Sequence, residues 1–131
     1  MEKTTASAKW RGGVAFSVRV GDHEVISDLP QEKGGQDAGP TPPQLVVGAL
    51  AACTGMFAKL FTDREGLAAE GIEAVAEAET LQSPARLDNF SVQLTFPSLP
   101  AGKRDRARAF VEACLVGHTL KAGASVNLKL A

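Results

Sequence analysis

The sequence predicts an α+β fold, because it contains strand-like and helix-like hydrophobic periodicities that do not alternate regularly. Apolar residues recur at every second position in three segments, as in half-buried strands: Val14–Val20, Ile72–Leu81 and Phe90–Phe96. An apolar run over Leu45–Phe61 and an amphipathic stretch over Lys103–Ala113 are typical of helices. The expected order is β-β-α-β-β-α-β, with residues 1–131 forming a single domain.

Turn residues define the outer strands of this order. The segment Trp10–Ser27 is expected to form a hairpin that turns at Gly21-Asp22. Residues 29–40 and 82–89 are rich in turn formers and are predicted to be loops. The segment Ala124–Leu130 alternates again and is expected to close the fold as a strand.

The long helix has clear end signals. Thr41 is a good N-cap, and the two prolines that follow suit a first helical turn, whose N–H groups lack partners. The helix is predicted to run to about Arg64 and to stop near Gly66. It is apolar on almost every face and rich in small residues, so it belongs in a core. In so short a chain, we expect a second subunit to contribute to that burial.

Charge and hydropathy narrow the function classes. The net charge is −1, so there is no basic surplus to neutralise phosphates, and nucleic acid is not an expected partner. The first nine residues contain no apolar signal core, and the longest apolar stretch, Leu45–Cys53, is shorter than a bilayer requires. We therefore expect no membrane partner and a cytoplasmic location, where reducing conditions favour free or catalytic thiols.

The two cysteines are the residues most able to carry chemistry. Cys53 lies in the apolar helix and Cys114 at the end of the amphipathic one, 61 residues apart, so no CxxC motif joins them. Each could be a small buried hydrophobe or a reactive thiol, and the two could meet in the fold. If Val116–Leu120 opens a new helical turn, Cys114 would lie at its N-terminus, with His118 on the same face.

The cysteines could also bind a metal ion, and an arginine could lie near one of the thiols. Cys53, Cys114, His118 and His23 would make a four-ligand zinc set, but structural zinc ligands are usually paired at short spacing, so no metal is expected. Arg11 precedes Gly12-Gly13, where its guanidinium could stabilise a thiolate or simply be an exposed strand-end charge. Arg19 is a weaker candidate for this cation, because its place in the strand alternation puts its side chain on the face opposite the apolar residues.

Two motifs resemble the OsmC/Ohr family, the osmotically inducible and organic hydroperoxide resistance proteins. The family's glycine-rich loop, its Asn/Ser-Pro-x-Glu-Leu motif and its helix ending in Ala-Ala-Cys are similar to Gly39–Leu45 and Ala51–Cys53. The family's Cys-Pro-Val-x-x-Thr/Ala-Leu motif is similar to Cys114–Leu120. The family glutamate falls here on Pro43 or Gln44, and Leu115 replaces the family proline.

The resemblance implies an antiparallel sheet wrapped around a central apolar helix, in an interwoven homodimer with active sites at the subunit interface. It implies a cofactor-free, cysteine-based peroxidase that reduces an organic hydroperoxide in oxidative-stress defence. Cys53 would attack the peroxide, Cys114 would resolve the sulfenic acid as a disulfide, and an external dithiol would reset the pair. Arg11 would supply the cation for Cys53, and Gln44 could accept a hydrogen bond from that guanidinium.

Two alternatives to the peroxidase stay open. The missing glutamate is compatible with a small-molecule binding protein that has the OsmC fold but no peroxidase activity. In the other alternative, both thiols are inert core residues of an interaction module.

Overall fold

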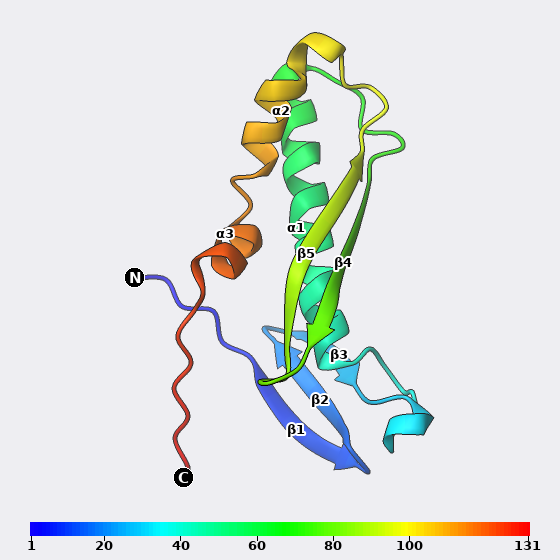
Figure 1. Cartoon of the computed structure of the whole chain (residues 1–131), viewed down its shortest axis with the longest axis vertical. Coiled ribbons are helices and arrows are strands. Elements are labelled where there is room, and N and C mark those ends of the chain that lie inside the picture. Colours follow the sequence, from blue (N-terminus) through cyan, green and yellow to red (C-terminus); the bar gives the residue numbers. More distant parts are fainter. The chain divides into compact units, whose positions relative to one another are not determined.

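In the computed structural model, which describes residues 1–131, one long helix lies between two sets of strands in chain order (Figure 1). The strands are β1 (Ser7–Gly12), β2 (Ala15–Val20), β3 (His23–Ser27), β4 (Glu73–Leu81) and β5 (Arg86–Thr95). The helices are α1 (Pro42–Glu65), α2 (Arg104–Val111) and α3 (Leu115–Ala122), with short 3-10 turns at Gln31–Lys33 and Ala101–Lys103. The chain divides into two compact units, Met1–Val46 and Val47–Ala131.

The first unit contains a three-stranded antiparallel sheet in the order β1-β2-β3. Its β2–β3 hairpin, with the turn at Gly21-Asp22, confirms the predicted second half of the Trp10–Ser27 segment. The prediction missed β1, because only two of its six residues, Ala8 and Trp10, are strongly apolar and the pattern is too short to stand out. Val14, expected in a strand, instead lies in the turn between β1 and β2.

A buried carboxylate organises the loop that follows β3. Asp28 accepts backbone hydrogen bonds from Leu29, Gln36 and Ala38 at 2.8, 3.1 and 3.1 Å. These bonds, chiefly that from Leu29, lower the pKa of the Asp28 carboxyl below its ordinary value of 3.8. The loop 29–40 is therefore held by a charged side chain rather than by regular structure, and it leads directly into α1.

We expect the loop to lose this support in acid and in the variant Asp28→Asn. Because the folded pKa is depressed, the stabilisation is complete above about pH 4 and is lost as the pH falls toward the folded pKa. Thermal unfolding at pH 7 should thus give a lower Tm for Asp28→Asn than for the wild type, and the difference should shrink near pH 3. Asp37→Asn, at an exposed position in the same loop, is the control. An equal Tm for wild type and Asp28→Asn at pH 7 would contradict the assignment.

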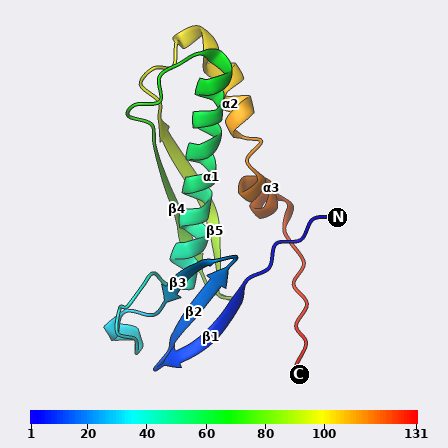
Figure 2. The same cartoon turned by 180° about the vertical axis from the view of Figure 1, so that it is seen from behind.

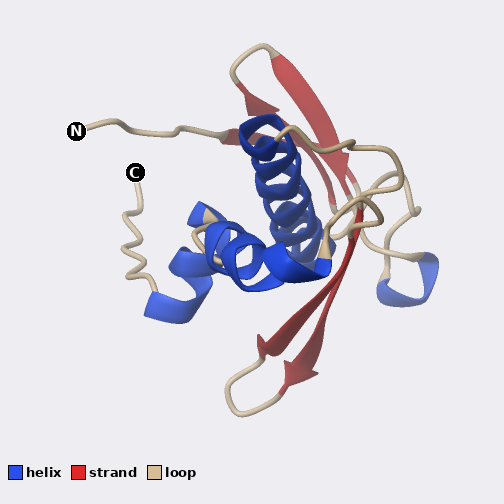
Figure 3. Ribbon diagram, turned by 90° about the horizontal axis from the view of Figure 1, so that it is seen from above, coloured by secondary structure: helices blue, strands red, loops and turns tan.

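The second unit is built around the greater part of α1, with the β4–β5 hairpin and α2 packed against it (Figures 1 and 2). Phe61 of α1 contacts Phe96, just beyond β5, and Phe110 of α2, with ring centroids 6.3 and 5.6 Å away. One stripe of α1 is buried: Leu50, Thr54, Ala58, Phe61 and Thr62. Figure 3 shows α2 beside α1 from above. The core of this unit thus forms along one face of α1.

The bounds of α1 follow from its end signals. Thr41 and Gln44 form a capping box at its start, in which the Gln44 N–H donates to Thr41 Oγ1 at 3.2 Å. At its end, Gly66 has a left-handed φ of 69°, and the Leu67 N–H donates to the Thr62 carbonyl at 2.9 Å. The predicted N-cap and stop are therefore confirmed.

The length of α1 corrects one expectation. The helix has 24 residues, and its most apolar 18-residue window has a mean hydropathy of 1.7, so by length and composition it could cross a membrane. The sequence prediction considered only Leu45–Cys53, and it was wrong to dismiss the helix as too short. The central helix of a soluble protein satisfies the same criterion, and the absence of a membrane partner stays a prediction.

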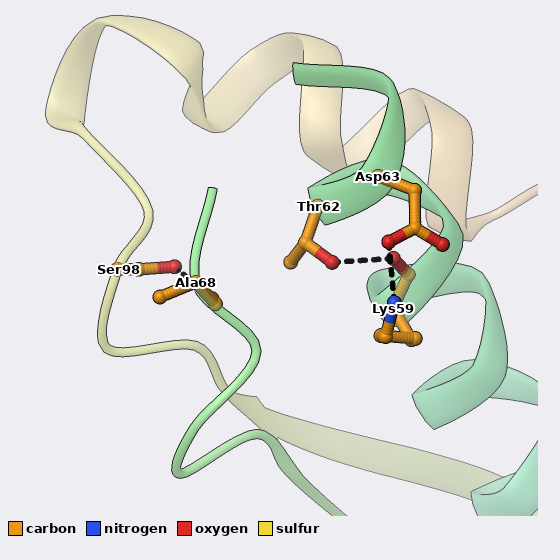
Figure 4. Close-up of polar contacts among 5 residues, drawn as sticks. All are labelled: Lys59, Thr62, Asp63, Ala68 and Ser98. Atoms are coloured by element: carbon orange, nitrogen blue, oxygen red, sulfur yellow. Dashed lines mark hydrogen bonds and ion pairs between the residues drawn. The ribbon is translucent and has the colours of Figure 1, made fainter. Parts of the chain in front are cut away.

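Polar contacts fix the far end of α1 (Figure 4). Lys59 pairs with Asp63 on the exposed side, and the Thr62 hydroxyl donates to the Lys59 carbonyl at 2.5 Å. The Ser98 hydroxyl donates to the Ala68 carbonyl at 2.5 Å, joining the chain segments on either side of the hairpin. Near the same end, Glu65 forms ion pairs with Lys103 and Arg106, which ties α1 to the start of α2.

Two strand boundaries differ from prediction. β5 begins at Arg86, inside the segment predicted to be a loop, because its first residues pair with the end of β4. The predicted last strand, Ala124–Leu130, forms no helix or strand (Figure 1). A strand needs a hydrogen-bonding neighbour, and no strand of this chain pairs with that segment. The alternating side chains of Val126, Leu128 and Leu130 are left more than four-fifths exposed.

Candidate functional site

The two cysteines meet in the second unit, although 61 residues separate them in the sequence. Cys53 lies on α1 at the edge of the buried stripe, three residues after Leu50, and is half-buried. Cys114 follows α2 as the N-cap residue of α3 and is only 3% exposed. Both thiols are free, and they lie close enough for Cys53 to raise the pKa of the Cys114 thiol. The helices thus assemble a dithiol pair.

Cys114 lies where its neutral form is favoured. Its burial, and then the nearby Cys53 side chain, raise the pKa of the Cys114 thiol above its ordinary value. The Gly117 N–H opposes this by donating to Cys114 Sγ at 3.4 Å, as expected of a residue that caps a helix. Cys114 is therefore protonated near neutral pH.

His118 follows the predicted helical turn. α3 is helical from Leu115 to Ala122, and the His118 N–H donates to the Cys114 carbonyl at 2.9 Å. Its imidazole is exposed. His23, the other histidine of the considered zinc set, belongs to the first unit, whereas both cysteines belong to the second.

An open groove of about 900 Å³ runs past Cys114. β5 contributes its inward apolar side chains Phe90, Val92 and Leu94, while α2 and α3 contribute Val111 and Leu120. Charged side chains of both signs also line it: Asp88, Arg104, Asp105, Arg108, Glu112 and Lys121. Sequence reasoning did not identify this groove. The sequence feature that relates to it is the alternation of Phe90–Phe96, whose apolar side chains line the groove.

Arg11 lies at a β-bulge in the first unit. The register between β1 and β2 shifts between Trp10 and Gly12, which leaves Arg11 without an opposite residue. Such bulges redirect a side chain away from the regular strand phase. Arg11 also lines a small cavity of about 350 Å³, together with Asp28 and the Gly34-Gly35 segment of the loop. The structure thus brings Cys53 and Cys114 together, while Arg11 belongs to the other unit.

Gln44 has a different role from the one expected. Its side-chain carbonyl Oε1 accepts a hydrogen bond from the Thr41 N–H at 2.9 Å, the reciprocal half of the capping box. This local bond stabilises the start of α1, and the expected acceptance from a guanidinium stays a prediction. The sequence contained this signal, since Thr41 and Gln44 have the spacing of a capping box.

Comparisons with known proteins bear on the family and the fold of this chain. The family described as OsmC-like protein matches residues 34–129. Among solved structures, a candidate osmotic stress induced and detoxification response protein from Psychrobacter arcticus is 19% identical, with a TM-score of 0.79 and coverage of 91% of this chain and 89% of that chain. A comparison with curated proteins finds no match.

Two further solved structures are similar. The organic hydroperoxide resistance protein OsmC from Legionella pneumophila is 21% identical, with a TM-score of 0.66 and coverage of 92% and 90% of the two chains. The OsmC like protein from Mycoplasma pneumoniae is 15% identical, with a TM-score of 0.74 and coverage of 92% and 88%. At these identities the likeness concerns the fold, which is the predicted α+β class.

Proposed function

Because this chain belongs to the OsmC-like protein family, we propose that it is a thiol-dependent hydroperoxide reductase that uses Cys53 and Cys114. The observation that carries the proposal is the proximity of these two free thiols, one half-buried and one buried, in the second unit. Some relatives of similar fold are named organic hydroperoxide resistance proteins. Those names support the reaction class proposed for this chain.

The proposed reaction has three balanced steps. The Cys53 sulfur attacks the peroxide O–O bond, gains one oxygen as a sulfenic acid and releases the alcohol. The Cys114 sulfur then displaces that oxygen as water and forms a disulfide with Cys53. An external dithiol reduces the disulfide and is itself oxidised. One hydroperoxide and one dithiol thus give one alcohol, one water and one oxidised dithiol.

The surroundings of the two sulfurs support their separate roles. Cys53 is the more accessible thiol, so a peroxide reaches it first. Because the pKa of Cys114 is raised, Cys114 stays protonated and brings no second negative charge beside the attacking sulfur. The family resemblance implies that Arg11 supplies a cation to this chemistry, and we keep that role as part of the proposal.

Peroxide consumption tests this proposal directly. Reduced protein, cumene hydroperoxide and excess dithiol should give steady peroxide loss. The protein should also form one intramolecular disulfide when one equivalent of peroxide is added without dithiol. No turnover above the Cys53→Ser background would overturn the proposal.

We further propose that the working form is a homodimer, with its active sites at the subunit interface. The side of α1 opposite the buried stripe leaves Met56 and Leu60 exposed at 65% and 50%, and the alternating segment after α3 is also exposed. A second copy would cover such apolar surface.

The dimer predicts a mass in solution twice that of one 13.7 kDa chain. Leu60→Glu should shift the equilibrium toward monomer, because it buries a charge in the proposed interface. Analytical ultracentrifugation measures the mass of the wild type and the fraction of monomer in the variant. Gln93→Glu, at an exposed position on β5, should leave the mass unchanged. A wild-type protein that sediments as a monomer at every concentration would contradict the dimer.

A second candidate function is a binding protein without peroxidase activity. Two observations favour it: the groove beside Cys114, and the use of Gln44 in the helix cap, at the place where the family motif that this chain resembles has its glutamate. Gln44→Glu separates the candidates, because glutamate preserves the capping box while restoring the charge. If this is a binding protein, wild-type turnover should be absent and should appear only in the variant. Equal turnover in both proteins would instead favour the peroxidase.

A further inference from the structure

Two aromatic residues, one on α1 and one on α2, are in contact close to the thiol pair. Each is four residues from one of the two cysteines in the sequence. Phe57 follows Cys53 by four residues, and Phe110 precedes Cys114 by four. On α1, residues four apart lie on the same helix face, so Cys53 and Phe57 share one. The rings of Phe57 and Phe110 lie 5.9 Å apart between centroids, at an interplanar angle of 52°. The aromatic pair thus lies one turn from Cys53 on α1 and just before the turn that leads from α2 to Cys114.

Phe110 is held on several sides. Its ring also contacts Phe61, one turn after Phe57, with centroids 5.6 Å apart at 57°. The Arg64 guanidinium lies 5.6 Å from the centroid of the same ring. Contact with two rings one turn apart restricts sliding of α2 along α1, because a slide would break one contact before another forms.

The backbone between Phe110 and Cys114 is tightly turned. The Ala113 N–H donates to the Phe110 carbonyl at 3.2 Å, and the Cys114 N–H donates to the Val111 carbonyl at 3.1 Å. These bonds leave little slack in the three intervening residues. A displacement of the Phe110 ring should therefore move the sulfur of Cys114.

Cys114 is also confined from the other side. A methyl group at Gly117 of α3 would lie 3.8 Å from Cys114 Sγ and 3.9 Å from Leu50 Cδ1, which are ordinary van der Waals distances. Leu50 precedes Cys53 by about one turn of α1. The thiol pair thus lies between the aromatic contact and the close approach of α3 to Leu50.

We propose that Phe110 is a positioning residue that holds the Cys114 sulfur within bonding reach of Cys53. The proposal rests on the proposed function in one respect, because there the disulfide is an intermediate of the reaction. Phe110 itself touches neither substrate nor sulfur in this role. It sets the effective concentration of one thiol for the other, the quantity that decides how readily the disulfide forms.

Equilibration with glutathione measures that quantity without any peroxide. One oxidised glutathione takes up the two hydrogens of the dithiol, giving two reduced glutathiones and the protein disulfide. Alkylation and mass spectrometry then give the ratio of dithiol to disulfide. We expect Phe110→Leu to lower the effective concentration about tenfold and Phe110→Tyr to stay within about twofold of wild type.

Phe96→Leu is the matched control. Phe96 contacts Phe61 edge-on, with centroids 6.3 Å apart, so its loss removes core packing but leaves the three contacts of Phe110 in place. Phe96→Leu should leave the effective concentration unchanged. An equal fall in both leucine variants, or no fall in Phe110→Leu, would overturn the proposal.

Two precautions keep the test decisive. If circular dichroism finds Phe110→Leu unfolded, Phe57→Leu tests the same ring contact from the other helix, with the same expected fall. The glutathione equilibrium does not require peroxidase activity, so a protein that fails to reduce peroxide can still give either result. Failure of the proposed function and failure of this inference are therefore distinguishable.

Discussion

Replacing Cys53 with serine is expected to reduce peroxide turnover by about a thousandfold or more, because no other group of the pair can take the first oxygen. Cys114 is buried and its pKa is raised, which makes it the poorer attacking group. Ala52→Ser, which adds a hydroxyl at the preceding exposed helix position, should retain nearly full turnover. The measurement is steady-state loss of cumene hydroperoxide with excess dithiol.

Cys114→Ser should differ from the wild type when peroxide is added without dithiol. The first attack needs only Cys53, so this variant should consume about one equivalent of peroxide per chain and then stall as a sulfenic acid. A reagent specific for sulfenic acids should label it, whereas the wild type should give a disulfide. If both serine variants behave alike, the assignment of separate roles to the two sulfurs is wrong.

The features that the sequence predicted best are those that depend on residues close together in the chain, such as helix ends. The bounds of α1 followed from Thr41 and Gly66, whose roles depend on neighbouring residues alone. The turn that opens α3 after Cys114 was similarly visible as a break at the end of the preceding helix. The family pattern then indicated that Cys53 and Cys114 would meet, which no local signal could show.

Features that depend on distant partners were not predicted. The segment Ala124–Leu130 has the alternation of a strand, but no other strand of the chain pairs with it. Arg11 was assigned from its place before two glycines, whereas the bulge that frees it depends on its register with β2. Gln44 is the exception, because its hydrogen-bond partner Thr41 is only three residues away and the capping-box spacing was visible in the sequence. In the other cases the deciding contact lay outside the pattern considered.

Phe61→Ala is expected to cost about 3–5 kcal/mol of unfolding free energy, the largest stability effect in the second unit. Phe61 is 2% exposed and contacts both Phe96 and Phe110, so its truncation leaves a cavity where the hairpin and α2 meet α1. Urea unfolding followed by circular dichroism measures the loss. A cost below about 1 kcal/mol would mean that the core collapses around the site or lies elsewhere.

Met56→Ala, on the opposite side of α1, distinguishes an exposed surface from an interface. Met56 is 65% exposed within the chain, and truncation of such a residue in a monomer changes stability by about 0.5 kcal/mol or less. If a second copy covers this side, the same truncation should destabilise the dimer, and wild-type stability should rise with protein concentration. Unfolding at two concentrations a hundredfold apart separates these outcomes. A small cost for Met56→Ala at both concentrations, beside a large cost for Phe61→Ala, would mean that α1 keeps one side in solvent.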